Sequence, residues 1–175
     1  MLLPRDQDGI LKDRRLIFYQ RDVEEIDKVL DEFLRLSESR CALLIDKEGH
    51  LVTRKGLTAS LDIDTISALV AGSFAATKEM ARLLGEEEFS VLFHQGKKDN
   101  IQLTLIGERT LLAVIFDDRT TVGMVRLYAT EASTKLVKVF ERVNKNTMED
   151  AGMPAYNEKE SKEALDRLFG NLGIE

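Results

Sequence analysis

Three short hydrophobic segments follow one another in the second half of the chain, and they restrict the fold more than any other feature. The segments are EFSVLFHQ, IQLTLIG and LLAVIFD, and only the turn sequences GKKDN and GERT separate them. The first two alternate between apolar and polar residues, as strands with one buried face do, whereas the third is a continuous apolar run and predicts a fully buried strand. Because parallel neighbours require a long crossover, connections this short predict antiparallel pairing.

An earlier stretch, CALLIDKEGHLVTRKG, predicts two more strands. The apolar run CALLI and the run HLVTR lie on either side of DKEG. Gly49 can supply the backbone torsions that a tight turn requires. The stretch therefore predicts a β-hairpin.

Three longer segments carry apolar residues at helical spacing. They are RDVEEIDKVLDEFLRLS, DIDTISALVAGSFAATKEMARLLG and VGMVRLYATEASTKLVKVFERVNK. In the second segment, Asp62 or Asp64 can cap the N-terminus and Gly85 can end the helix. The predicted order is helix, two strands, helix, three strands, helix. This order indicates the α+β class, with a five-stranded antiparallel sheet and helices on both of its faces.

The composition changes outside this central domain, which we predict to span residues 16–145. Residues 1–15 mix charges with a proline and a glycine and predict a flexible N-terminal arm. Residues 146–157 are polar, with a glycine and a proline, and predict a linker.

A short amphipathic helix is predicted over residues 158–172, with Leu165, Leu168 and Phe169 on one face. Residues 146–175 contain seven acidic and three basic residues, so this region carries much of the net negative charge. A helix this short is only marginally stable alone. It either folds back on its own domain or docks on a partner.

The overall charge and composition exclude several function classes. The net charge is -6 and the pI is about 5.1, which disfavours binding to nucleic acid or to an anionic membrane. Cys41 is the only cysteine, so no disulfide within the chain is possible. No apolar run reaches the roughly 18 residues that a membrane span needs. We expect a cytoplasmic protein that does not insert into membranes.

No group of residues predicts an active site. The two histidines, His50 and His94, each lie near a strand and do not form an H-x-x-x-H pair. The sequence GKK at 96–98 lacks the glycine and the Ser or Thr of a phosphate-binding loop, and it joins two strands. The acids of FDD at 116–118 resemble a metal-binding strand end, but without a phosphate-binding loop we interpret them as leading into the next helix. We therefore expect no catalytic residue, no metal and no cofactor.

Arg119 offers one alternative. It lies in a predicted loop, from which an arginine can act in trans on the active site of a GTPase. A single loop arginine is weak evidence for that role.

The helix that contains SALVAGSFAATKEMARLLG has more apolar surface than a single core contact needs. At about 100° per residue, one side should dock on the sheet, and the opposite side should face outward. The predicted docked side comprises Ile66, Leu69, Val70, Ser73, Thr77, Met80 and Leu84, and the predicted outward side comprises Ala68, Ala71, Gly72 and Ala75, followed by Lys78, Glu79 and Arg82. Alanine favours helix formation, but Gly72 costs about 1 kcal/mol in a helix interior relative to alanine. We therefore predict that this small-residue side contacts another protein.

Several of these stretches resemble the roadblock/dynein light chain superfamily and, within it, the MglB-type gliding regulators of bacteria. The similar stretches are ALLIDKEGHLV, SALVAGSFAATKEMARLLGEEEF, FHQGKKDNIQLTLIGERTLLAVIFDDRTTVGMVRL and the final LDRLFGNL. The resemblance covers roughly residues 16–145 and the C-terminal helix, and it does not include the N-terminal arm.

The resemblance implies a homodimer in which the second helices and the edge strands of two subunits meet. It also implies binding to a Ras-like small GTPase of the MglA type, two subunits per GTPase, and stimulation of GTP hydrolysis in cell polarity and motility. MglB-type proteins remodel the GTPase rather than insert an arginine finger, which argues against that role for Arg119. The implied GTPase and dimer interface comprises Ala68, Ala71, Gly72, Ala75, Glu79 and Arg82, and a second implied GTPase contact comprises Leu165, Leu168 and Phe169.

Two other functions stay open. A roadblock domain can be a non-catalytic scaffold or adaptor subunit in a signalling or motor assembly. An α+β domain of this kind can also sense a small molecule, although no polar constellation is evident inside the predicted core.

Overall fold

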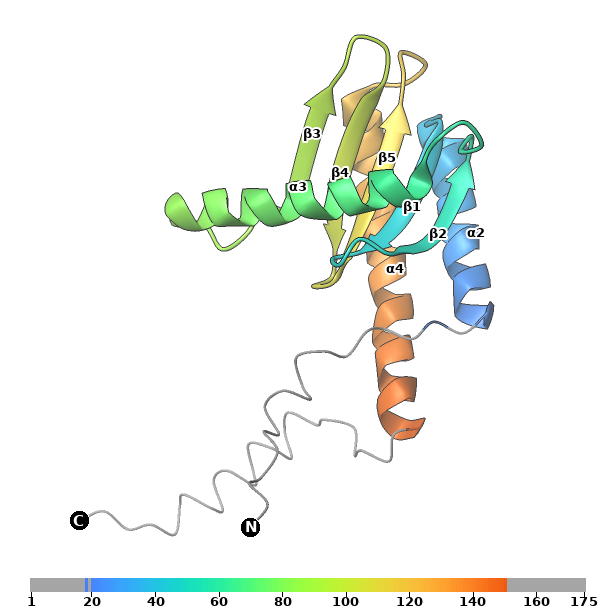
Figure 1. Ribbon diagram of the computed structural model, residues 1–175. Helices are drawn as coiled ribbons and strands as arrows, with labels where there is room; N and C mark the ends of the chain where they lie inside the picture. The colour runs from blue at the N-terminus through green and yellow to red at the C-terminus, as the bar shows by residue number, and fades with distance from the viewer. Residues whose placement is uncertain (1–17, 19, 151–175) are drawn as a thin grey trace, which may run out of the picture. The chain divides into compact units, whose positions relative to one another are not determined.

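The computed structural model describes residue 18 and residues 20–150 (Figure 1). It contains, in chain order, α2 (Gln20–Ser37), β1 (Cys41–Asp46), β2 (Leu51–Gly56), α3 (Ile63–Leu83), β3 (Val91–Gln95), β4 (Asn100–Ile106), β5 (Thr110–Phe116) and α4 (Val122–Asp150). The predicted order of helices and strands is confirmed. The predicted N-terminal arm and C-terminal helix, with Leu165, Leu168 and Phe169, lie outside the described residues.

The five strands form one antiparallel sheet in the order β2-β1-β5-β4-β3. β1 joins the first hairpin to the later three strands through its pairing with β5, which runs from Cys41 opposite Ile115 to Asp46 opposite Thr110. Every residue of β5 is buried, as its continuous apolar run predicts. β2 and β3 are left as the edge strands.

Helices cover both faces of this sheet, as predicted. In Figure 1, α3 crosses the front face, and α2 and α4 lie behind it. The core between α3 and the sheet contains Leu43, Ile45, Ile63, Val70, Phe74, Leu103, Leu111 and Ala113. This packing fixes which side of α3 faces away from the sheet.

Both predicted ends of α3 are confirmed. The Asp62 carboxylate accepts hydrogen bonds from the Thr65 hydroxyl at 2.7 Å and from the Thr65 backbone N–H at 3.2 Å, and these bonds lower the pKa of Asp62. At the other end, Gly85 has φ +78°, and the N–H groups of Gly85 and Glu86 bond to the carbonyls of Arg82 and Ala81. This is a Schellman motif, which requires a left-handed residue and so favours glycine.

Residues Phe18–Phe140 form one compact unit. The sheet and the candidate site described below lie in this unit. Helix α4 extends to Asp150 and so continues into the segment predicted as a linker.

Candidate functional site

One side of α3 is buried, and Ile63, Val70 and Phe74 on this side belong to the core that α3 shares with the sheet. The buried residues are Ile63, Ser67, Val70, Ala71, Phe74 and Ala81. Ile63, Val70, Phe74 and Ala81 follow one another at spacings of seven, four and seven, which keeps them on one side of a helix. Phe74, the largest of them, is only 3% exposed.

The predicted orientation of α3 is therefore partly wrong. Leu69, Met80 and Leu84, expected on the docked side, are 65%, 52% and 73% exposed, and Ser73 is exposed as well. Ala71, expected outward, is only 7% exposed. Because apolar residues surround most of this helix, their spacing alone did not determine which of them face the sheet.

The length of α3 explains part of this exposure. A helix of 21 residues is about 32 Å long, whereas five strands about 4.8 Å apart span about 19 Å between the outermost two. Figure 1 shows the C-terminal end of α3 extending past β3, the edge strand. Met80, Leu83 and Leu84 belong to this end, so the sheet cannot bury them.

The outward face of α3 is smooth and apolar. Ala68, Gly72 and Ala75 are exposed as predicted, and Leu69 lies beside them. A Cβ added at Gly72 would meet nothing within 4 Å, so packing within the chain gives no reason for a glycine there. We call Ala68, Leu69, Gly72, Ala75, Ala76, Met80 and Leu83 the α3 face. Its exposure and apolar character are typical of a surface that binds another protein.

Two charged residues lie beside this face near the C-terminal end of the helix. Glu79 and Arg82 are exposed, and the Arg82 Nε donates a hydrogen bond to the Glu79 carboxylate at 3.1 Å. An exposed pair of this kind contributes little to stability. Both side chains therefore remain accessible to a partner.

The turn between β1 and β2 packs closely on α3. Gly49 has φ +93°, and a Cβ there would lie 3.0 Å from the Ala68 Cα. The glycine thus allows both the turn and the close approach of the two backbones.

A small hollow lies along one edge of α3, next to this face. Its volume is about 100 Å³, and it is lined by Lys47, Ala71, Phe74, Ala75, Lys78, Glu88 and Leu111. At its rim, the Glu88 carboxylate is 3.5 Å from the Lys47 Nζ and 3.6 Å from the Lys78 Nζ. An open depression of about 400 Å³ shares these three charged residues. Sequence reasoning missed this hollow because its residues come from four separate segments.

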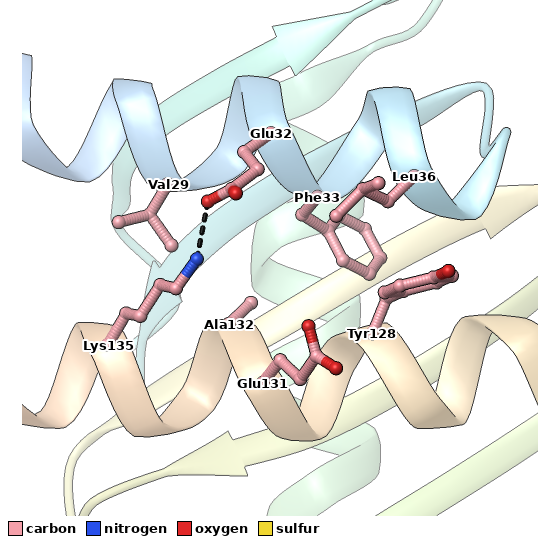
Figure 2. A pocket seen from close by; sticks show the side chains of 8 residues that line it. All are labelled: Val29, Glu32, Phe33, Leu36, Tyr128, Glu131, Ala132 and Lys135. Carbon is pink, nitrogen blue, oxygen red and sulfur yellow. Dashed lines mark hydrogen bonds and ion pairs between the residues drawn. The ribbon is translucent and has the colours of Figure 1, made fainter.

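The contact between α2 and α4 on the other face of the sheet is nearly filled. Figure 2 shows the side chains that line it, among them Phe33 and Tyr128, and the ion pair between Glu32 and Lys135. The hydrogen bond from Lys135 lowers the pKa of Glu32. The remaining space is about 10 Å³, about one water molecule, so this pocket does not support a small-molecule sensor.

Arg119 is held by its own loop. Its Nε and its backbone N–H donate to Asp117 Oδ1 at 2.9 and 3.2 Å. These bonds lower the pKa of Asp117, and the carboxylate raises the pKa of Arg119. An arginine finger would first have to break this pair.

The other residues considered for chemistry do not form a cluster. The Nδ1 of His50 lies 3.1 Å from an oxygen of Asp46, and His94 is exposed on β3. Within the described residues, no three His, Cys, Asp or Glu side chains are placed to hold a metal ion. None of the helices in that part of the chain is long and apolar enough to span a membrane.

Comparison with known proteins supports a specific family. The Roadblock/LC7 domain matches residues 25–116. The structure of Myxococcus xanthus MglB is 38% identical with a TM-score of 0.69, covering 73% of this chain and 96% of that one. The gliding protein MglB of Thermus thermophilus is 35% identical with a TM-score of 0.69, covering 74% and 98%. A structure described as MglB with tetrameric arrangement is 34% identical with a TM-score of 0.71, covering 75% and 98%. The chain belongs to the Roadblock/LC7 domain family and is similar to its MglB members.

Proposed function

We propose that this protein is a cytoplasmic homodimeric regulator that binds a Ras-like small GTPase of the MglA type and stimulates its GTP hydrolysis. The observation that carries the proposal is the α3 face, which is apolar, exposed and open at Gly72. The likeness to MglB proteins over about three quarters of the chain supports the GTPase as its partner. The process served would be bacterial cell polarity or motility.

In this proposal, a sister subunit and the GTPase share the α3 face. The tetrameric arrangement of one MglB relative supports self-association. In the proposed complex, two subunits bind one GTPase, and Ala68, Gly72 and Ala75 lie at the contact with Glu79 and Arg82 at its border. Ala71 is buried, so in this complex a partner could contact it only through the hollow.

The proposed mechanism needs no catalytic residue from this chain. A regulator can accelerate hydrolysis by ordering the catalytic residues of the GTPase, because binding shifts the GTPase toward its active conformation. The Asp117 pair that holds Arg119 fits this mechanism better than an arginine finger.

A GTP turnover assay tests the proposal. The small Ras-like GTPase of the same organism is measured alone and with increasing amounts of this protein. We expect turnover to rise by at least tenfold and to saturate at two subunits per GTPase. Binding without any change in turnover would favour a scaffold or adaptor, and an absence of binding would contradict both functions.

Truncation tests the second contact, at Leu165, Leu168 and Phe169. We expect removal of residues 151–175 to weaken GTPase binding by about tenfold, the loss of one good apolar contact. Ending the chain at Asp150 leaves α4 complete. Mass measurement by light scattering should show an unchanged dimer, and an unchanged affinity would mean that the C-terminal segment does not contact the GTPase.

A further inference from the structure

We draw no further inference here: the strongest candidate, the outer edge of β3 together with the apolar C-terminal end of α3 that extends past it at Met80, Leu83 and Leu84, belongs to the self-association already contained in the proposed function.

Discussion

Replacing Ala75 with arginine should abolish binding of the small GTPase while the protein remains folded. Ala75 is exposed on α3, so a long charged side chain can extend into solvent in the free protein. In a complex, the same side chain would have to enter a closely packed apolar contact. Burying an unpaired charge there costs several kcal/mol, and a loss of about 4 kcal/mol already lowers affinity about 1,000-fold.

The result needs a matched control and a test of folding. Thr134→Arg introduces the same side chain at an exposed position on α4 and should leave binding unchanged. Circular dichroism and thermal unfolding should show both variants folded, and light scattering should show whether Ala75→Arg remains a dimer. Unimpaired GTPase binding by Ala75→Arg would remove the α3 face from the proposed interface.

The order of helices and strands could be predicted because each segment has a clear hydrophobic period. The continuous run in β5 and the turn at Gly49 each have one simple structural interpretation. The alternation in β4 predicted the strand but not its burial, because its polar residues Gln102 and Thr104 are buried as well. The short connections then predicted the antiparallel pairing. Local sequence also predicted both ends of α3, since Asp62 and Gly85 act on neighbouring backbone groups.

The orientation of α3 could not be predicted in the same way. Leu69 and Met80 are as apolar as Val70 and Phe74, and a helical wheel does not distinguish residues that face the sheet from residues that bind a partner. The sheet also ends before the helix does, which the sequence of α3 does not reveal. An apolar helix of this kind therefore indicates that a binding surface exists, but it does not show which residues form that surface.

The hollow could not be predicted from the sequence, for a different reason. Lys47 and Glu88 are far apart in the chain, and neither belongs to a recognisable motif. Lys47 follows β1 and Glu88 follows α3, and only the packing of α3 on the sheet places them at one rim. Because these charges come from separate segments, only the fold shows that they lie together.

The second large effect concerns folding rather than binding: Gly56→Ala should strongly destabilise the protein. Gly56 ends β2 with φ +90°, a conformation that costs a residue with a Cβ roughly 1–2 kcal/mol. An added Cβ would also lie 2.4 Å from the carbonyl oxygen of Arg40 and 2.9 Å from the Cα of Cys41, both backbone atoms. Since β2 pairs with β1 at this point, the clash can be relieved only by separating the hairpin. We expect a loss of about 3–5 kcal/mol in the free energy of unfolding.

Gly107→Ala provides the comparison that separates backbone strain from this clash. Gly107 also has positive φ, +61°, but a Cβ there would meet nothing within 4 Å. We expect Gly107→Ala to lower the free energy of unfolding by only roughly 1–2 kcal/mol, the cost of the left-handed conformation. Urea unfolding of both variants measures the difference, at one protomer concentration because the proposed dimerisation would make stability depend on concentration. Equal losses would mean that the contact with the Arg40 carbonyl does not constrain Gly56. If Gly56→Ala loses GTPase binding, it should do so in proportion to the unfolded fraction, whereas Ala75→Arg should lose binding while fully folded.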